Sequence, residues 1–278
     1  MRLHLAHVVV IGGGYVGQLV QLAMHSVRIL DWRKKPPIDH LETRMGPQYL
    51  WEPIPGVESY SFPVMTLVDG RPPTGDAILA YKQKIGKEHD GGDWGLQFQH
   101  MMTGYHSQLP IPRIEYNRRV VSVDLANHRL LLSDDAVIDY DVLINTIPLN
   151  VFLSLCYIPP IVIDPWRHDV IHMRIEPLGR NVYDGMVLNY LSDPKDRYYR
   201  LTTWQAQAFA ETLHPVPGDI TRPLIPGKIH THRESERVLK DLSVFDTFCF
   251  GRFATWRPDE LAHETWKQIM AWRGTHEL

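Results

Sequence analysis

The amino-acid sequence predicts an α/β protein in which a parallel sheet is combined with a second, mostly antiparallel unit. Three observations lead to this fold class. The stretch "HVVVIGGGYVGQLVQLAMHSVRILD" (7–31) reads as strand, glycine turn, helix and strand, the pattern of a βαβ unit. The run "VLINTI" (142–147) reads as another buried strand, and "FDTFCF" (245–250) returns to the same pattern. The segments between them have the turns and apolar runs of antiparallel strands.

Length and composition narrow the class of protein further. The chain has 278 residues, enough for one large domain or two small ones. Its net charge of -3 excludes a strongly basic nucleic-acid binder on bulk grounds, although a local basic patch stays open. Cys156 and Cys249 lie far apart in apolar runs, which favours buried thiols in a reducing compartment. No apolar run is long enough to cross a membrane as a helix, so we expect a cytoplasmic protein without a membrane partner.

The first elements follow from the spacing of apolar residues. "HVVVI" (7–11) is continuously apolar, as is typical of a parallel strand that is buried on both faces. In "YVGQLVQLAMH" (15–25) the apolar residues recur at helical spacing. "VRIL" (27–30) predicts the second strand, which ends at Asp31. Residues 32–110 are less regular: we expect a helix over 76–89 and a short helix in "FQHMMTGYH" (98–106).

The later elements are predicted in the same way. Strands are expected over 119–125, 129–133 and 137–147, separated by turns at Asn127, Asp134 and Asp135. A hairpin is expected over 185–204, with its turn in "SDPKD", and a C-terminal helix from Pro258. These elements divide into a first domain of residues 1–50, 113–150 and 241–278 and a second domain of residues 51–112 and 151–240.

The glycine turn carries the clearest chemical signal. Gly12, Gly14 and Gly17 give G-x-G-x-x-G between a strand and a helix, which allows a tight turn and close approach of the backbone to a pyrophosphate. The helix N-terminus then offers N–H groups to phosphate. Asp31 follows Gly12 by nineteen residues, the position of an acid that binds ribose hydroxyls. We therefore predict a dinucleotide site; the alternative is a glycine-rich turn without a ligand.

Distant segments separate FAD from NAD. "VIGGGYVG", "ILD", "RRVVSVDL", "YDVLINTIPL" and "CFGRFATW" together resemble the superfamily of amine oxidases, protoporphyrinogen oxidase and UDP-galactopyranose mutase. The resemblance implies a Rossmann-like FAD-binding domain with a mostly antiparallel β substrate domain, as in the glutathione-reductase type of FAD fold. The sequence departs from the superfamily after Asp31, where "WRKKPP" stands in place of a further glycine motif, and in its short length.

The resemblance also implies roles for single residues. The glycines would line the FAD pyrophosphate, Asp31 would accept hydrogen bonds from the ribose, and Val120 or Val121 would meet adenine through the backbone. Gly251 and Arg252 would lie beside the pyrophosphate and the ribityl chain. The residues expected to bind FAD are Gly12, Gly13, Gly14, Tyr15, Val16, Gly17, Asp31, Trp32, Arg33, Val120, Val121, Thr146, Gly251, Arg252 and Trp256.

On the substrate side, the resemblance points to Arg200 as a catalytic residue, with Tyr199 and Trp204 as its neighbours. The alternative is that Arg200 is a strand arginine in a salt bridge and that the aromatic residues pack a sheet. The two histidines of "KIHTH" (228–232) are interpreted as surface residues, because no further ligand is apparent, so no metal site is predicted.

The predicted function is that of an FAD-dependent oxidoreductase that removes a hydride from a C–N bond of an amine or amino-acid-type substrate. Two alternatives remain open: a non-redox flavoenzyme of the UDP-galactopyranose mutase kind, and a bacteriophage flavoenzyme that oxidises an amino acid attached to modified thymidine in DNA. The partner is therefore a small-molecule or nucleotide-linked substrate, with DNA kept open because of the basic residues Arg33, Lys34, Lys35, Arg118 and Arg119.

Overall fold

The computed structural model describes residues 7–34, 50–87, 98–107, 109–110, 113–162, 171–177, 184–215, 217–218, 222–224, 233–257 and 260–276. The chain forms two compact units. The first unit consists of Met1–Thr43, Gln108–Ile163 and Thr231–Leu278, and the second of Arg44–Ser107 and Asp164–His230. Each unit is therefore built from segments that are far apart in the sequence.

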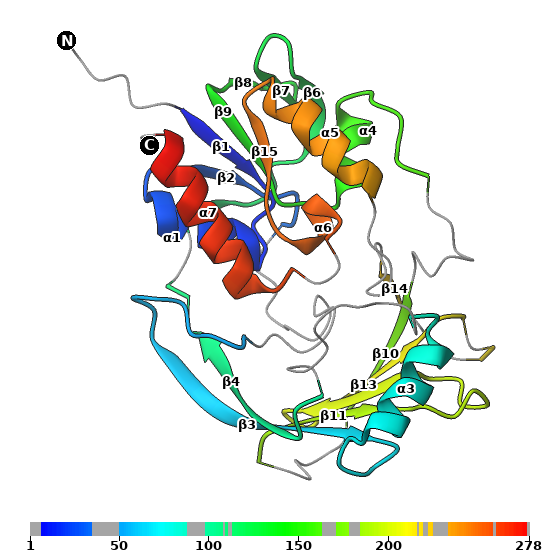
Figure 1. Ribbon diagram of the computed structural model, residues 1–278. Helices are drawn as coiled ribbons and strands as arrows, with labels where there is room; N and C mark the ends of the chain where they lie inside the picture. The colour runs from blue at the N-terminus through cyan, green and yellow to red at the C-terminus, as the bar shows by residue number, and fades with distance from the viewer. Residues whose placement is uncertain are drawn as a thin grey trace. The chain divides into compact units, whose positions relative to one another are not determined.

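The first unit contains a five-stranded parallel sheet with the strand order β15-β9-β1-β2-β5 (Figure 1). Strands β2 and β5 lie on one side of β1, and the later strands β9 and β15 lie on the other side. The strand order therefore reverses between β1 and β9, as in a dinucleotide-binding fold. Its elements are β1 (Val8–Ile11), α1 (Tyr15–Met24), β2 (Arg28–Leu30), β5 (Ile114–Glu115), β6 (Val120–Asp124), β7 (Arg129–Leu132), β8 (Val137–Asp139), β9 (Val142–Asn145), α4 (Leu149–Leu155), α5 (Arg233–Ser243), β15 (Thr247–Cys249), α6 (Arg252–Thr255) and α7 (Ala262–His276).

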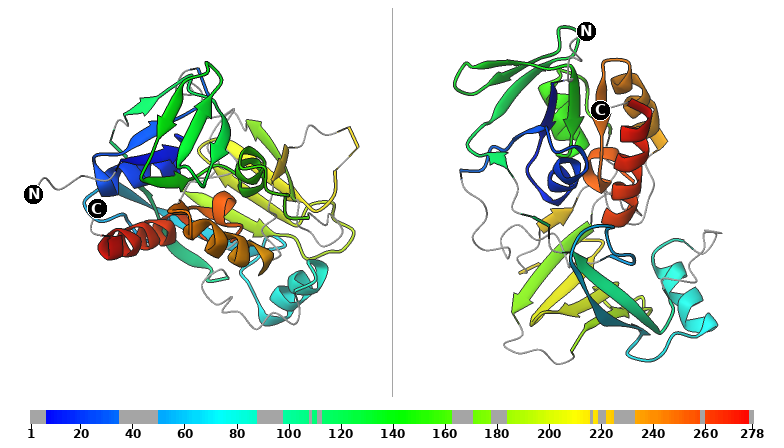
Figure 2. Two further views of the ribbon diagram at one scale, coloured as in Figure 1. Left: turned by 90° about the horizontal axis from the view of Figure 1, so that it is seen from above. Right: turned by 90° about the vertical axis from the view of Figure 1, so that its left-hand side faces the viewer.

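The predicted βαβ unit is confirmed: β1 and β2 are parallel and joined by α1. All four residues of β1 are buried, which explains the continuous apolar run. Strands β6, β7 and β8 form a separate antiparallel sheet, whose turns hold His128 and Asp135 at positive φ. Figures 1 and 2 place this small sheet and α7 on opposite sides of the five-stranded sheet, and α1 lies beside α7.

The second unit contains a seven-stranded sheet with the order β14-β10-β13-β12-β11-β3-β4. All its strand pairs are antiparallel except β11 with β3, and the predicted hairpin of β11 and β12 is confirmed. The elements are β3 (Ser59–Val68), α3 (Gly75–Lys84), β4 (Met101–Ser107), β10 (Ile171–Pro177), β11 (Met186–Tyr190), β12 (Arg200–Trp204), β13 (Gln207–Thr212) and β14 (Arg222–Leu224).

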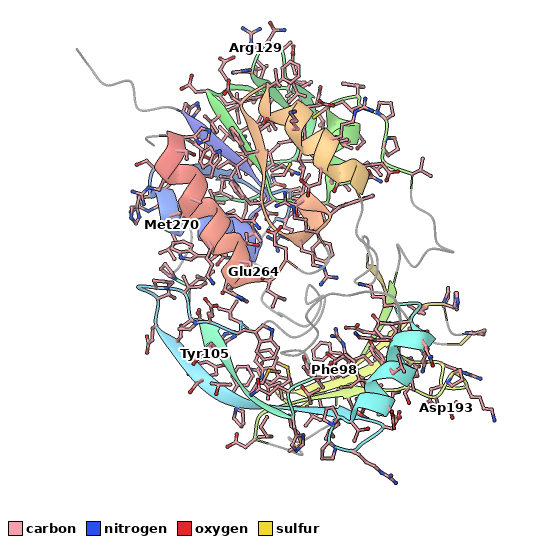
Figure 3. All side chains as sticks on the ribbon, in the orientation of Figure 1. Phe98, Tyr105, Arg129, Asp193, Glu264 and Met270 are labelled. Atoms are coloured by element: carbon pink, nitrogen blue, oxygen red, sulfur yellow. The ribbon has the colours of Figure 1, made fainter. Side chains whose placement is uncertain are left out.

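An aromatic cluster fills the core of the second unit. Tyr81 from α3 and Phe98 both contact the ring of Tyr190, with ring centroids 4.9 Å apart in each case. Figure 3 labels Phe98 among the side chains of this unit. The cluster continues along one face of the sheet through buried apolar residues of β3, β11 and β13. Alternate residues along β3 and β11 are buried, so their side chains lie on one face of the sheet. This apolar face packs against α3.

Three sequence-based expectations are wrong or shifted. Residues 98–106 do not form a helix, because 101–107 belong to β4 and pair with β3 over seven residues. The ten-residue strand β3 lies in a region that looked irregular. The C-terminal helix begins at Ala262 instead of Pro258, which lies outside the described residues. In the two strands, long-range pairing outweighs the weak local pattern.

The units also differ in extent from the sequence-based domains. Helix α4 crosses the expected boundary at residue 150 and lies wholly within the first unit, as does α5, which crosses the expected boundary at 240. The physical reason is packing: α4 contacts β6 and α6, and α5 contacts β15, all of which are elements of the first unit. The histidines of 228–232 lie outside the described residues.

Candidate functional site

The glycine turn connects β1 to α1 at the carboxyl end of β1, and three of its glycines have no room for a side chain. Gly12 has φ +107°, and a Cβ there would lie 2.5 Å from Thr146 Oγ1. A Cβ on Gly13 would lie 2.7 Å from Asp31 Oδ2. A Cβ on Gly17 would lie 2.1 Å from the carbonyl oxygen of Gly12, so the helix approaches the strand end as closely as backbones allow.

Gly14 differs from these three glycines. It is the N-cap of α1, it is exposed, and a Cβ there would meet nothing within 4 Å. No side chain caps the helix and no acidic residue stands in its first turn. The N-terminus of α1 therefore keeps its positive end and its first N–H groups for an anion. At the first position of the helix, burial raises the pKa of Tyr15 to about 12, so this phenol stays neutral.

Thr146 joins the carboxyl end of β9 to the glycine turn. Its hydroxyl donates toward the carbonyl oxygens of Ile11 at 3.0 Å and Gly12 at 2.9 Å, and its N–H donates to Ile11 at 3.0 Å. The sequence predicts Thr146 as a residue of the cofactor site, and in the structure its hydrogen bonds tie the end of β9 to the glycine turn. Because it follows β9, it lies where the strand order passes through β1, the usual ligand position in open α/β sheets.

Gly251 brings the C-terminal segment to the same place. It follows β15, has φ +86°, and a Cβ there would lie 2.6 Å from Val16 in the first turn of α1. Its N–H donates to Glu260 Oε1 at 3.1 Å. Glu260 is buried and also accepts hydrogen bonds from the hydroxyls of Thr255 at 2.8 Å and Thr265 at 2.7 Å. The hydrogen bonds of Glu260 therefore hold the Gly251 segment against the first turn of α1.

Asp31 ends β2 beside Gly13, and it is only 3% exposed. Its Oδ2 accepts the N–H of Gly13 at 2.9 Å, and its Oδ1 accepts the backbone N–H and Nε of Arg33, each at 2.9 Å. The Nη2 of Arg33 also donates to Oδ2. Burial alone raises the pKa of Asp31, but the hydrogen bonds and charge of Arg33 and the Gly13 N–H outweigh it, so the pKa lies below its usual value.

The remaining predicted cofactor residues lie in the first unit in different surroundings. Trp32, next to Asp31, is 68% exposed. Val120 is buried, whereas Val121 is exposed at an irregularity in the pairing of β6 with β7. The guanidinium of Arg252 lies 5.5 Å from the ring centroid of Phe253. Trp256 is 1% exposed, so its ring packs in the interior and offers no open face to a ligand.

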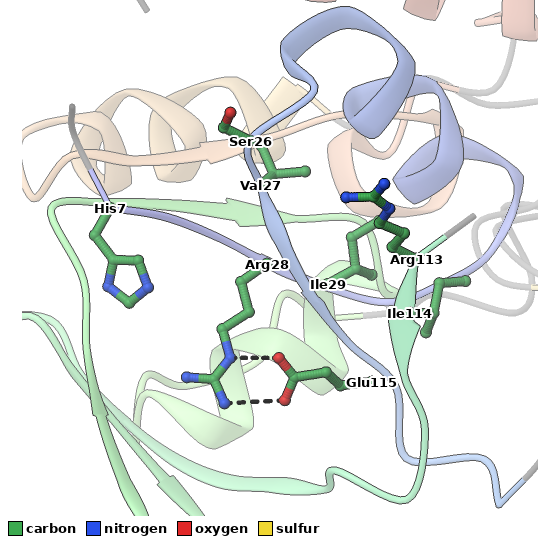
Figure 4. A pocket seen from close by; sticks show the side chains of 8 residues that line it. All are labelled: His7, Ser26, Val27, Arg28, Ile29, Arg113, Ile114 and Glu115. Carbon is green, nitrogen blue, oxygen red and sulfur yellow. Dashed lines mark hydrogen bonds and ion pairs between the residues drawn. The ribbon is translucent and has the colours of Figure 1, made fainter.

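A pocket of about 370 Å³ lies elsewhere on the first unit (Figure 4). His7, Val27 and Arg113 line it, and they directly precede β1, β2 and β5. Within it, Arg28 donates two hydrogen bonds to Glu115, at 2.6 and 2.9 Å. Ligands of open α/β sheets bind at the carboxyl ends of strands, so this pocket at the amino ends is distinct from the glycine turn at the carboxyl end of β1.

Arg200, predicted as catalytic, lies in the second unit in an ion pair. Its Nη2 donates to Glu211 Oε1 at 2.5 Å, and the hydroxyl of Tyr199 donates to Glu211 Oε2 at 2.6 Å. Glu211 is fully buried. Burial and the charge of Glu211 raise the pKa of Tyr199 well above its usual value. Trp204 is buried too and stacks on Phe62, with centroids 5.5 Å apart. These contacts agree with the alternative of a strand arginine in a salt bridge.

The sequence did not identify two buried acids, Glu260 in the first unit and Glu211 in the second, each of which accepts several hydrogen bonds within its own unit. Glu260 lies two residues after Pro258, where the sequence predicts only the start of a helix, and Glu211 is not singled out by any sequence pattern. The signal for Glu211 is its place opposite Arg200 across a hairpin of β12 and β13, which needs the register to be known. Glu260 has no comparable local signal, because its partner Gly251 lies nine residues before it and its partner Thr265 five residues after it, with no regular spacing.

Three further observations concern possible membrane spans, metal sites and cysteines. Within the described residues, no helix is long and apolar enough to cross a membrane. The same residues contain no group of three or more histidine, cysteine or acidic side chains placed to hold a metal ion. The two cysteines are free thiols, and burial raises the pKa of each to about 12.

Comparison with known proteins finds solved structures that have a similar fold. No protein-family model and no curated protein matches the sequence. The crystal structure of reduced UDP-galactopyranose mutase is similar over 98% of this chain and 95% of that chain, with a TM-score of 0.58 and 12% identity.

Two further structures are similar at a lower level. A fatty acid isomerase from P. acnes has a TM-score of 0.49 at 12% identity over 98% of this chain and 99% of that chain. The flavin-dependent halogenase BrvH from Brevundimonas sp. BAL3 has 0.49 at 10% identity over 97% and 71%. The mutase comparison, together with the strand order, confirms the predicted fold class: the chain has the two-unit, Rossmann-like α/β fold of the UDP-galactopyranose mutase structure.

Proposed function

We propose that this chain binds FAD and is an FAD-dependent oxidoreductase. The observation that carries the proposal is the convergence of three chain segments on the N-terminus of α1. The glycine turn follows β1, Thr146 follows β9 and Gly251 follows β15, so each segment comes from the carboxyl end of a parallel strand. This is the position at which doubly wound folds bind dinucleotides.

The residues at this position fit the dinucleotide. Gly14 leaves open space in front of the helix, where the pyrophosphate can meet backbone N–H groups. Asp31 accepts the N–H of Gly13 at 2.9 Å, and an acid in this position binds the ribose hydroxyls in dinucleotide-binding folds. FAD is favoured over NAD by the resemblance of the distant segments "YDVLINTIPL" and "CFGRFATW" and by the fold shared with the mutase structure.

The reaction we propose is removal of a hydride from a C–N bond of an amine or amino-acid-type substrate. When bound, the flavin accepts the hydride, so the protein needs no nucleophile of its own. The chain would contribute position and electrostatics: the end of α1 holds the phosphates, Asp31 the ribose, and Glu260 the turn at Gly251. The electron acceptor is dioxygen or another oxidant that regenerates the flavin.

The first test is binding of FAD to purified protein, followed by absorbance near 450 nm and isothermal titration. Gly14→Asp is the informative variant. Aspartate is a favourable N-cap, so the fold should be kept, but its charge would repel the pyrophosphate and weaken FAD binding by at least about tenfold. Gly75→Asp, at the first position of α3 with equally open space, is the matched control and should bind FAD like the wild type. Equal affinity of both variants would contradict the proposal.

A second candidate, a non-redox mutase, is supported by the shared fold. It predicts conversion of a UDP-sugar by the dithionite-reduced protein without net oxidation, whereas the oxidoreductase predicts hydrogen peroxide from amines or amino acids. The ion pair of Arg200 with Glu211 weakens the mutase argument that rested on a substrate-binding Arg200. A panel with both substrate classes separates the two candidates.

The DNA-linked substrate has less support. Of the basic residues that favoured it, Arg33 pairs with Asp31 and Arg118 pairs with Asp134, so two of these charges are neutralised within the protein. Release of peroxide from an aminoacylated thymidine in DNA, and none from the free amino acid, would restore this alternative.

A further inference from the structure

We propose that Arg33 is a specificity-determining latch: its guanidinium occupies the two acceptor positions of Asp31 that the vicinal hydroxyls of a ribose would use. The proposal rests on the function proposed above, because it needs a ribose-containing dinucleotide beside Gly13. The sequence predicts Arg33 among the residues that bind FAD, whereas the latch has the opposite role: it opposes binding until the Arg33 side chain rotates away from Asp31.

The carboxylate of Asp31 has no acceptor position to spare. A carboxylate offers two positions on each oxygen. On Oδ1 they are taken by the N–H and the Nε of Arg33, and on Oδ2 by the N–H of Gly13 and the Nη2 of Arg33. The side chain of Asp31 is 3% exposed and that of Arg33 is 23% exposed, so water competes poorly for the same positions. A ribose can therefore reach Asp31 only after the guanidinium has left.

The backbone around the latch is held in place, so opening is a side-chain event. The N–H of Asp31 donates to Glu115 at 3.0 Å, and its carbonyl oxygen accepts the N–H of Arg118 at 2.9 Å. The carbonyl oxygen of Arg33 accepts the N–H of Asn117 at 2.7 Å. Rotation of the Arg33 side chain breaks two hydrogen bonds to Asp31 and leaves the two from backbone N–H groups intact.

The positions that open have the chemistry of a diol site. The guanidinium presents two parallel donors, one to each oxygen of the carboxylate. The 2′- and 3′-hydroxyls of a ribose also present two neighbouring donors, so the diol can replace the fork atom for atom. A ligand with only one of these hydroxyls would leave one carboxylate oxygen short of a donor in a buried site, which is costly. The latch thus rejects ligands that lack the full diol.

The decisive experiment measures affinity by titration of the purified protein with FAD and with ADP. Arg33→Met keeps the apolar stem and removes the competing donors. We expect the Kd for both ligands to fall by about tenfold, equivalent to about 1.4 kcal/mol. The gain for 2′-deoxy-ADP should be at least as large, because the variant no longer has to exchange the two donors of the guanidinium for a single hydroxyl. Arg33→Lys, which keeps the charge but loses the fork, should give an intermediate gain and serves if Arg33→Met does not fold.

The matched control is Arg28→Met. Arg28 forms the same two-donor contact with a carboxylate, that of Glu115, in the same unit but at the amino end of β2. Because Arg28 lies at the amino end of the strand, away from Asp31, Arg28→Met should leave the Kd for FAD unchanged within about twofold. A second readout is a double-mutant cycle: Asp31→Asn should weaken FAD binding more in the Arg33→Met background than in the wild type, where the loss of the ribose acceptor is offset by release of the latch.

Unchanged or weaker binding of FAD and ADP by Arg33→Met and Arg33→Lys would overturn the latch while leaving the FAD proposal standing. Tighter binding of ADP by Arg33→Met, in a protein that does not bind FAD, would support the latch and contradict the choice of cofactor. Failure of wild type and variants to bind either ligand would overturn both proposals.

Discussion

At the residue scale, the glycine turn shows that its glycines serve different physical purposes. Gly12 adopts a positive φ, Gly13 places its N–H against Asp31, and Gly17 lets the helix touch the end of the strand. Gly14 has no such constraint and instead leaves space in front of the helix. A motif that appears uniform in the sequence therefore divides into positions that the fold requires and one position, Gly14, that the fold does not require and that the proposed ligand would use.

Gly17→Ala tests this division. The added methyl group would lie 2.1 Å from a backbone oxygen, so α1 must shift away from β1. Overpacking of this kind costs roughly 1–3 kcal/mol, which outweighs the gain in helix propensity of about 1 kcal/mol. We expect a lower free energy of urea unfolding, followed by circular dichroism. Gly14→Ser is the control: serine is a favourable N-cap and a Cβ at this position meets nothing within 4 Å, so that free energy should not fall.

At the scale of elements, the hairpin of β12 and β13 shows how register creates a charge pair. Arg200 and Glu211 are direct partners in this hairpin, so both side chains lie on the same face of the sheet. That face is the buried one, with Tyr190 beneath the guanidinium at 5.8 Å. The pair therefore belongs to the core of the second unit, which gives it a structural role irrespective of any role toward a substrate.

Arg200→Met is expected to destabilise the protein strongly. It leaves the buried carboxylate of Glu211 without its cation, and loss of one partner of a buried pair costs roughly 3–5 kcal/mol. The double variant Arg200→Met/Glu211→Gln removes both charges and should recover much of this loss. Urea unfolding of the two single variants and the double variant measures the coupling. Wild-type stability in Arg200→Met, with activity lost, would instead favour the catalytic role predicted from the sequence.

At the scale of the whole molecule, the chain leaves the first unit and returns to it twice, so its stability depends on contacts between distant segments. The ion pairs of the first unit include Asp31–Arg33, Glu115–Arg28 and Glu236–Arg257. Hydrogen bonds from Arg28 and Arg257 lower the pKa of Glu115 and of Glu236, and the pKa of Asp31 is lowered in spite of its burial.

These shifts predict acid sensitivity. A carboxyl group whose pKa is lower in the folded state stabilises the fold above its unfolded pKa, roughly 3.9 for Asp and 4.3 for Glu, and loses this contribution as the pH falls further. We expect the melting temperature to drop below about pH 4.5. Asp31→Asn should reduce this drop more than Glu236→Gln, because Glu236 is largely exposed and surface pairs contribute little. An identical drop in wild type and Asp31→Asn would contradict this account.

Much of the first unit could be predicted because its signals are local. Continuous apolar runs identify β1, β2 and β9, and helical spacing identifies α1. The second unit was harder, since β3 and β4 form by pairing with strands that lie elsewhere in the chain. The site followed the same rule: the glycines and Asp31 were found from spacing, whereas Glu260 and the partner of Arg200 were not.

The sequence by itself determined the βαβ unit and the composition of the glycine turn, because a tight turn and a buried parallel strand each demand particular residues within a short stretch. Only the tertiary structure decided which hydrogen-bonding groups meet. It placed Arg33 on Asp31, Glu260 on Gly251 and Glu211 on Arg200. The physical reason is that a hydrogen bond depends on distance in space, and the fold brings these partners within about 3 Å of each other irrespective of their separation along the chain.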